Sequence, residues 1–348
     1  MKALVFKGPE SISFDEVKEP EIESPLDAVI RVRLAGICGS DLHVYHGREK
    51  GLDPGTVMGH EYVGEVLAAG PEAPGLAAGD LVFGSFTTSC GACFYCMRGL
   101  TSRCLSGRLF GWRQAGHGLH GAQAEMLRVP LAATTLMKVP PGVTPEAALL
   151  LGDNLATGDF CAEMAGVSPG GVWVVIGCGS VGLMAILASR EMGGADLLAV
   201  DAVPERLERA ARLGAATIDY RREDPVARVR ARTGGRGADG VMEAVGSPEA
   251  TRLAYEMVRP GGTIAAAGVH TEPAFAITPA EAYDKNLTYR AGRCPARAYM
   301  DKLGALAASG KVDKAGVITH RLPLREGPNA YRIFAERKEG CIKVVLEP

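Results

Sequence analysis

Four of the nine cysteines in this 348-residue chain fall between residues 90 and 104, in the pattern C-x2-C-x2-C-x7-C. They are Cys90, Cys93, Cys96 and Cys104. Short spacings let successive thiolates converge on one metal ion, and a shell of four thiolates leaves no coordination position open for a substrate. We therefore predict a structural zinc in this segment, which stabilises a lobe and does no chemistry. An iron–sulfur cluster uses the same four ligands, and four unrelated buried cysteines are the interpretation without a metal.

A second chemical signal is the glycine-rich sequence GCGSVG, which matches the pattern G-x-G-x-x-G. It follows the apolar run VWVVI and opens the apolar stretch VGLMAILASRE, which is the strand-to-helix context that a dinucleotide-binding turn requires. The first glycine makes the turn, the second admits a pyrophosphate, the third lets the helix pack closely, and the helix N-terminus binds phosphate. The candidate cofactor-binding residues are Gly177, Gly179, Ser180, Val181 and Gly182. The alternative is a glycine turn without a nucleotide.

An acidic residue stands at about the spacing expected for a ribose-binding carboxylate. Asp201 ends the next apolar run, 19 residues after Gly182. A carboxylate there accepts hydrogen bonds from the adenosine ribose and repels a 2′-phosphate, so the sequence predicts NAD rather than NADP. The competing interpretation is that Asp201 is a surface acid.

Two further segments carry polar residues that core packing does not explain. They read GICGSDLH, residues 36–43, and GHE, residues 59–61. A lone cysteine or histidine is more often a packing or surface residue. Here both occur beside a cysteine cluster and a nucleotide-binding turn, which favours a catalytic site.

The composition limits the kind of protein that carries these residues. The chain is 47% hydrophobic and 22% charged, with a formal net charge of −2, which is typical of a globular protein of about two domains. Without a basic face we expect no nucleic-acid partner, and without a long apolar run or a signal peptide we expect no membrane span. We therefore expect a cytoplasmic protein, in which clustered thiols favour metal binding over disulfides.

The predicted secondary structure that positions these residues differs between the first and the middle part of the chain. Up to about residue 152, strand-like runs such as 28–34, 61–67 and 81–83 alternate with Pro/Gly turns, as in an irregular antiparallel β domain. From about 155 to 290, apolar runs at 172–176, 197–200, 241–245 and 263–268 alternate with helical stretches such as 181–191 and 204–213. This alternation predicts a doubly wound parallel sheet, and hence an α/β chain.

The C-terminal part of the chain could belong to either domain. We expect a helix over residues 300–309 and a last strand over 342–346. This strand could extend the parallel sheet or return to the first domain, and the sequence leaves both open.

Four motifs of this chain, taken together and in their order, resemble the zinc-dependent medium-chain alcohol dehydrogenase family. They are GICGSDLH, GHE, the four-cysteine segment and GCGSVG. The resemblance covers essentially the whole chain. It implies a GroES-like irregular β catalytic domain over residues 1–154 and 292–348, and a Rossmann dinucleotide-binding domain over 155–291. The stretches GAQAEMLRVP and AGRCPARAYM resemble, more loosely, the branch with glutathione-independent formaldehyde dehydrogenases and their shorter relatives.

The resemblance also implies a ligand set for a catalytic zinc. Cys38 and His60 would bind the ion, with Glu61 or water as an exchangeable ligand. Many members have a cysteine as the third ligand, where this chain has Asp153 in the sequence GDNLATG. Some branches use an acid there, and carboxylate oxygen is an acceptable zinc ligand. The alternative is that Asp153 is a helix N-cap, which would leave the site one ligand short.

Further residues take roles from the same resemblance. Ser40 and His43 would carry the substrate proton away, and Asp41 would hold His60, as outer carboxylates usually do. The remaining candidates near the cofactor are Thr157, Arg206, Gly268, Val269 and Lys343.

The implied activity is hydride transfer between NAD and an alcohol, an aldehyde hydrate or a polyol. The implied cofactors are NAD and two zinc ions per subunit, one catalytic and one structural. Family habit suggests a homodimer or homotetramer with a small-molecule substrate. The rival interpretations are a zinc-independent carbonyl or quinone reductase of the same fold and a non-catalytic NAD-binding redox sensor.

Overall fold

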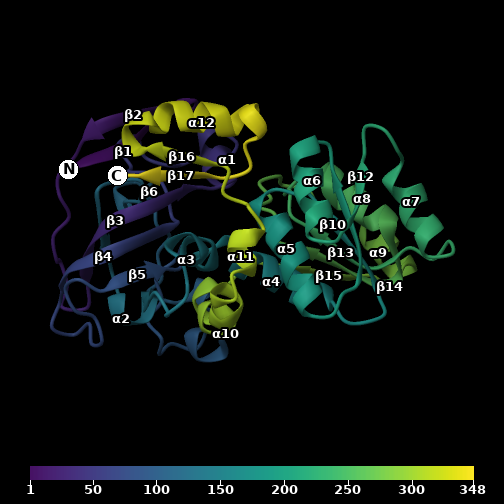
Figure 1. Ribbon diagram of the computed structural model, residues 1–348, viewed down its shortest axis with the longest axis horizontal. Helices are drawn as coiled ribbons and strands as arrows, with labels where there is room; N and C mark the ends of the chain where they lie inside the picture. The colour runs from purple at the N-terminus through teal and green to yellow at the C-terminus, as the bar shows by residue number, and fades with distance from the viewer. The chain divides into compact units, whose positions relative to one another are not determined.

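In the computed structural model, which describes residues 1–348, the chain forms two units (Figure 1). The first comprises Met1–Asp153, Pro295–Lys314 and Ile318–Pro348, and the second comprises Asn154–Cys294 and Ala315–Val317. The first unit is therefore assembled from segments at both ends of the sequence.

The second unit is built on a sheet of six parallel strands in the order β12-β11-β10-β13-β14-β15. This sheet confirms the predicted doubly wound arrangement. The strands are β10 (Val172–Ile176), β11 (Asp196–Asp201), β12 (Ala216–Asp219), β13 (Ala238–Glu243), β14 (Val258–Ala266) and β15 (Thr288–Ala291). The order reverses between β10 and β13, and the carboxyl ends of the strands at such a reversal are where ligands bind in open α/β sheets.

Helices cover both faces of this sheet (Figure 1). One layer is formed by α4 (Asn154–Ala165), α5 (Ser180–Glu191) and α6 (Pro204–Arg212), and the other contains α7 (Pro225–Arg232) and α8 (Pro248–Met257). A short helix, α9 (Pro279–Asp284), starts with a capping box. Proline at the first turn and a Ser, Thr or Asp cap begin α7, α8 and α9, because the orphan N–H groups of a first turn need an acceptor.

The prediction for β13 was wrong at its end. The strand stops at Glu243 rather than running to Val245. The N–H groups of Val245 and Gly246 bond to the Glu243 side chain, each across 2.7 Å, instead of continuing the ladder. A carboxylate inside an apolar run therefore ends the strand and shapes the next turn.

The first unit is built on a mostly antiparallel sheet in the order β16-β17-β3-β4-β5-β9, with β8 also on β3. Its last strand, β17, pairs antiparallel with β3, so the C-terminal strand returns to the first unit. The strands of this sheet are β3 (Ala28–Ile37), β4 (Tyr62–Ala69), β5 (Leu81–Gly84), β8 (Met126–Val129), β9 (Leu136–Lys138), β16 (His320–Pro323) and β17 (Val344–Glu347). Two hairpins, β1 (Lys2–Gly8) with β2 (Ser11–Glu16) and β6 (Trp112–Gln114) with β7 (His117–Leu119), stand apart from it.

The helices of the first unit are α1 (Asp41–Tyr45), α2 (Ala132–Thr135), α3 (Pro145–Gly152), α10 (Ala296–Ala308), α11 (Lys311–Lys314) and α12 (Gly327–Ala335). The sixth and last of these, α12, contributes Tyr331, Ile333 and Phe334 to an apolar core with Leu4, Phe6 and Ile37. Helix α3 begins at a Thr144 cap and packs against β3, β4 and β5. These contacts hold the C-terminal end of α3 beside the end of β3. No helix combines the length and apolar character needed to cross a membrane.

Candidate active site

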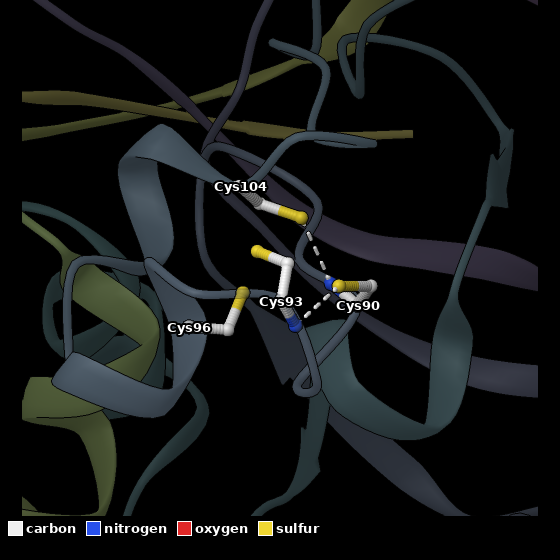
Figure 2. Close-up of side chains that lie close together, drawn as sticks. All are labelled: Cys90, Cys93, Cys96 and Cys104. Atoms are coloured by element: carbon white, nitrogen blue, oxygen red, sulfur yellow. Dashed lines mark hydrogen bonds between the residues drawn. The ribbon is translucent and has the colours of Figure 1, made fainter.

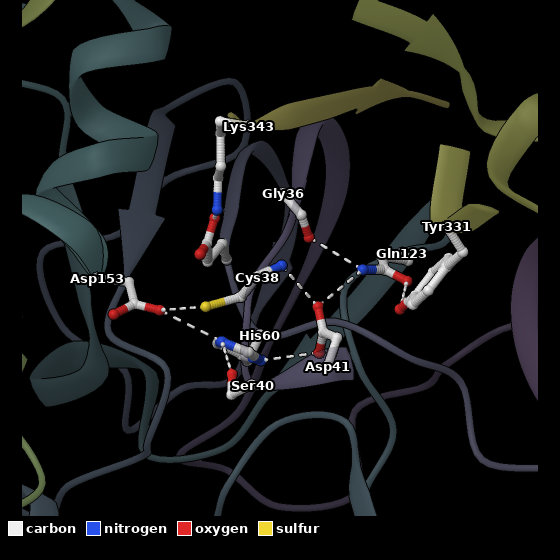
Figure 3. A network of polar contacts seen from close by, with 10 residues as sticks. Gly36, Cys38, Ser40, Asp41, His60, Gln123, Asp153, Tyr331 and Lys343 are labelled. Carbon is white, nitrogen blue, oxygen red and sulfur yellow. Dashed lines mark hydrogen bonds and ion pairs between the residues drawn. The ribbon is translucent and has the colours of Figure 1, made fainter. Parts of the chain in front are cut away.

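Four potential metal ligands from three separate segments converge in the first unit (Figure 3). Cys38 follows the last residue of β3, and His60 and Glu61 precede β4, whose Tyr62 is paired with Ala35 of β3. Asp153 follows α3. Their ligand atoms all lie within 4.8 Å of one another, and all four residues are buried. The structure thus brings together the four residues that the family resemblance assigned to the catalytic zinc.

The closest contacts centre on the Asp153 carboxylate. Its Oδ2 atom lies 3.2 Å from Nε2 of His60 and accepts a bond from Sγ of Cys38 across 3.7 Å. The N-cap interpretation of Asp153 does not account for these contacts, which turn its side chain toward the other ligands.

The donor set fits a zinc ion. Burial raises the pKa of the Cys38 thiol, and the nearby Asp153 and Glu61 carboxylates raise it further. Burial lowers the pKa of His60, but Asp41 and Asp153 outweigh it and raise the pKa well above its ordinary value. A divalent cation reverses both tendencies, because it favours thiolate, neutral imidazole and carboxylate as ligands. One sulfur, one nitrogen and carboxylate oxygen are the ligands that zinc takes in catalytic sites.

A neighbouring carboxylate orients the imidazole. Oδ1 of Asp41 lies 3.3 Å from Nδ1 of His60, and its Oδ2 atom accepts the N–H of Cys38 across 2.9 Å. With a cation bound, Nδ1–H of His60 would donate to Asp41 and leave the Nε2 lone pair free for the ion. Ser40 has its Oγ atom 3.3 Å from the same Nε2, and His43 is buried in the short helix that begins at Asp41.

Glu61 is paired with Lys343, which comes from the C-terminal segment. Both side chains are fully buried. Burial alone would lower the pKa of Lys343, but Glu61 reverses the effect and raises it. Gly36 leaves the room that Glu61 needs, because a Cβ atom at Gly36 would overlap the carboxylate. The structure therefore places Lys343 beside a candidate zinc ligand.

The four cysteines of the opening motif also converge, in a separate lobe of the same unit (Figure 2). Their sulfur atoms lie within 4.8 Å of one another. The N–H of Cys90 donates to Sγ of Cys104 across 3.2 Å, and the N–H of Cys93 donates to Sγ of Cys90 across 3.4 Å. Backbone N–H groups lower the pKa of Cys93 to about 6, whereas burial raises the pKa of Cys96 to about 12 and also raises that of Cys104. Donors aimed at sulfur stabilise thiolates, which are the form that binds metal.

The charge of the surrounding segment suits four thiolates. Residues 81–124 contain no acidic residue and four arginines, at 98, 103, 108 and 113. Four thiolates around a Zn²⁺ ion carry a net charge of −2, so positive charge without competing carboxylates favours such a centre.

The glycine-rich turn in the second unit has the backbone form of a phosphate-binding loop. Gly177 has a positive φ of 86°, and a Cβ atom at Gly182 would overlap the carbonyl oxygen of Gly177. A Cβ atom at Gly179 would meet nothing within 4 Å, so the space above this residue is open to a ligand. Ser180 and Val181 begin α5, whose N–H groups are available to phosphate.

Asp201 ends β11 as predicted, beside this turn. Its Oδ2 atom accepts the N–H of Cys178 across 2.7 Å, and its Oδ1 atom accepts the N–H groups of Ala202 and Val203. Nη1 of Arg206 lies 3.8 Å away. The carboxylate is thus held in one orientation at the carboxyl edge of the sheet.

The other predicted cofactor residues lie at different depths of the second unit. Thr157 is buried in α4, Gly268 lies against the backbone of Gly246, and Val269 is 42% exposed. Val245 is 46% exposed at the end of the neighbouring loop. Val245 and Val269 are thus two large apolar side chains that remain exposed in the second unit.

Two buried polar residues of these units did not emerge from the sequence, Glu243 and Gln123. Glu243 is fully buried, with its Oε2 atom 2.9 Å from Nε2 of His270, and Gln123 bonds to Asp41. Glu243 and Gln123 are polar residues inside apolar runs, VMEAV and GAQA, and that contrast was the available signal.

The comparisons with known proteins agree with this geometry. Residues 24–141 match the model of the alcohol dehydrogenase GroES-like domain, and residues 180–309 match that of the zinc-binding dehydrogenase domain. Zinc-type alcohol dehydrogenase B of Aspergillus flavus is 40% identical, over 97% of this chain and 79% of that protein. The probable zinc-binding alcohol dehydrogenase of Mycobacterium tuberculosis is 39% identical, over 100% of this chain and 89% of that protein.

Among solved structures, the alcohol dehydrogenase TADH from Thermus sp. ATN1 is 44% identical, with a TM-score of 0.93 over 100% of this chain and 99% of that one. The fold and the site define a two-domain oxidoreductase with a GroES-like domain and a Rossmann domain. The chain belongs to the zinc-dependent medium-chain alcohol dehydrogenase family. It is an enzyme, and its family uses zinc and a nicotinamide dinucleotide. These relatives do not single out the formaldehyde dehydrogenase branch, which stays a prediction.

Proposed function

We propose that this chain oxidises a small alcohol, an aldehyde hydrate or a polyol with NAD, holding a catalytic zinc at Cys38, His60 and Asp153. The observation that carries the proposal is the convergence of a thiol, an imidazole and a carboxylate, from three segments, in one buried site. Neither a zinc-independent reductase nor a sensor without catalysis explains such a set. Glu61, beside Lys343, is the candidate exchangeable ligand.

When bound, zinc supplies Lewis acidity, which favours the loss of a proton from an alcohol near neutral pH. NAD⁺, when bound, would supply the hydride acceptor, and the net reaction would convert an alcohol and NAD⁺ into a carbonyl compound, NADH and one proton. The chain's own residues position the groups and move the proton. Ser40 accepts the hydroxyl proton at Oγ and passes it toward His43. Asp41 keeps His60 in the tautomer that leaves Nε2 free to bind.

In the second unit, the turn from Gly177 to Gly182 and the start of α5 bind the pyrophosphate. Asp201 accepts the ribose hydroxyls and disfavours a 2′-phosphate, which makes NAD the preferred cofactor. Val245 and Val269 offer an apolar surface to the nicotinamide ring.

We also propose a structural zinc at the four cysteines, which gives two ions per subunit. The nine thiols form no disulfide, which suits a reducing compartment such as the cytoplasm. A homodimer or homotetramer is the proposed assembly, and light scattering after size exclusion tests it.

The test combines metal analysis with turnover. The wild-type chain is expected to contain two zincs and to reduce NAD with at least one alcohol from a panel of primary alcohols, secondary alcohols and polyols. Cys38→Ala should lower the zinc content to one and the turnover by more than about 100-fold. Cys161→Ala, which removes a buried thiol from the second unit, should keep both ions and the activity. Near-normal turnover of Cys38→Ala would refute the assignment.

A further inference from the structure

Four buried polar side chains form a chain of contacts from helix α12 to the imidazole of His60 (Figure 3). The hydroxyl of Tyr331 donates to Oε1 of Gln123 across 2.8 Å. Nε2 of Gln123 donates to the carbonyl oxygen of Gly36 across 2.9 Å and to Oδ2 of Asp41 across 3.4 Å. Oδ1 of Asp41 faces Nδ1 of His60 across 3.3 Å. The series links the C-terminal helix to a candidate zinc ligand.

The partners determine which way the Gln123 amide points. The carbonyl oxygen of Gly36 can only accept a hydrogen bond, so the NH2 group of Gln123 must face it. The same NH2 group then reaches Asp41, and the amide oxygen is left to accept from Tyr331. The orientation of the amide therefore has a single assignment consistent with all three partners.

Core packing alone does not explain a glutamine at this position. Gln123 and Tyr331 are both fully buried, and burying an amide is costly unless its hydrogen bonds are made. The glutamine also packs on the backbone immediately before His60, because a Cβ atom at Gly59 would approach its Cδ atom to 2.8 Å. An apolar side chain would fill this space equally well. The hydrogen bonds of the amide therefore indicate a function other than packing.

We propose that Gln123 and Tyr331 are positioning residues for the catalytic zinc, acting through Asp41 on His60. The inference rests on the proposed function, since it assumes a zinc at Cys38, His60 and Asp153. Oδ2 of Asp41 receives two donors, the N–H of Cys38 and the amide of Gln123, which turn Oδ1 toward His60. Tyr331 holds the amide in the orientation in which it can donate. Without the amide, the Asp41 carboxylate has one anchor fewer and orients the imidazole less tightly.

The structure supplies a matched control. Tyr62 is another fully buried tyrosine of the first unit, and its hydroxyl has no hydrogen-bond partner. Tyr62→Phe and Tyr331→Phe therefore remove the same atom from equally buried rings, and only the second change breaks the series. The four-cysteine site is an internal reference, because it lies outside the series.

The experiment measures zinc affinity on the full chain by competition with a chelator. Gln123→Met keeps the length of the side chain and removes both polar groups. It should lower the affinity for the catalytic zinc by about 10–100-fold. Tyr331→Phe should lower the affinity for the same zinc by a smaller factor and leave the affinity of the four-cysteine site unchanged. The double variant should be no weaker than Gln123→Met, because the two residues act in one series. Tyr62→Phe should match the wild type.

Each contrary result has its own meaning. If Gln123→Met and Tyr331→Phe hold both ions as tightly as the wild type, the positioning role is refuted while the proposed function stands. The positioning role is also refuted if Tyr62→Phe weakens zinc as much as Tyr331→Phe does. A wild-type chain that binds zinc only at the cysteines refutes the proposed function and the positioning role together. Because Tyr331→Phe removes a single oxygen atom, it keeps the test decisive even if Gln123→Met folds poorly.

Discussion

The backbone N–H of Cys178 donates to Oδ2 of Asp201 across 2.7 Å, which joins the glycine-rich turn to the end of the next strand. Cys178 lies between the first two glycines of the motif, so the residue that we propose to bind the ribose also fixes the shape of the glycine-rich turn. Oδ1 of Asp201 is held by two further N–H groups. The carboxylate cannot turn away from a ligand without breaking these bonds.

Asp201→Ala should weaken the binding of NAD and reduce the discrimination against NADP. The change removes a charged acceptor for the ribose, and a hydrogen bond to a charged group contributes about 1.5–3 kcal/mol. We therefore expect the ratio of kcat/KM values for NAD and NADP to fall by about tenfold or more. Steady-state kinetics with both cofactors measures it. Asp219→Ala, at the end of the neighbouring strand β12, is the control, and an unchanged cofactor preference in Asp201→Ala would exclude the assigned role.

Cys93→Ser should destabilise the lobe before it affects the chemistry. Loss of one of four thiolates weakens a structural zinc, whose binding energy contributes to folding. For a unit of about this size, each kcal/mol lost lowers Tm by about 2–4 °C, so we expect a fall of several degrees in thermal melting. Turnover per zinc-loaded molecule at low temperature should stay near wild type. Normal melting with lost turnover would instead assign the cysteine site to catalysis.

Lys343→Met should be strongly destabilising, and a second change should rescue it. Lys343 and Glu61 are both fully buried, so the substitution leaves a carboxylate in the core without its partner. Removing one member of a buried ion pair costs about 3–5 kcal/mol, whereas replacing both members is often close to neutral. Urea unfolding of Lys343→Met and of Lys343→Met with Glu61→Gln measures the two effects. A double variant as unstable as the single one would show that the pair does not act as a unit.

His270→Gln should change stability only in acid. The hydrogen bond to Glu243 raises the pKa of His270 above its ordinary value of 6.5. A raised pKa means that protonated His270 stabilises the fold below the unfolded pKa, and that this contribution disappears as the pH rises through the folded pKa. The melting temperatures of wild type and His270→Gln should therefore differ at about pH 5.5 and coincide at about pH 8.5. A difference of the same size at both values would contradict the interpretation.

Sequence patterns predicted best those features that depend on residue type and short spacing. The four cysteines, the glycine-rich turn and Asp201 lie within single strand–turn–helix or loop segments, so their spacing reflects their geometry. The alternation of apolar runs and helical stretches likewise predicted the parallel sheet, because strands buried on both faces need continuous apolar sequence.

The features that escaped prediction depend on contacts between distant segments. Nothing local in the sequence shows that Lys343 reaches Glu61, or that Tyr331 reaches Gln123. The pairing of β17 with β3, which brings these residues in, was left open for the same reason. The early end of β13 was missed because the Glu243 side chain, rather than a turn residue, competes for the backbone N–H groups.

The discontinuity of the first unit has a consequence for biosynthesis. The hydroxyl of Tyr331 and the amide of Gln123 are 208 residues apart in sequence. At a translation rate of about 5–20 residues per second, the ribosome needs about 10–40 s to travel between them. During that interval Gln123 and Glu61 lack the C-terminal partners Tyr331 and Lys343 that contact them in the folded chain. The second unit can fold while the first still lacks its C-terminal segments, so the candidate zinc site is among the last parts of the new chain to form.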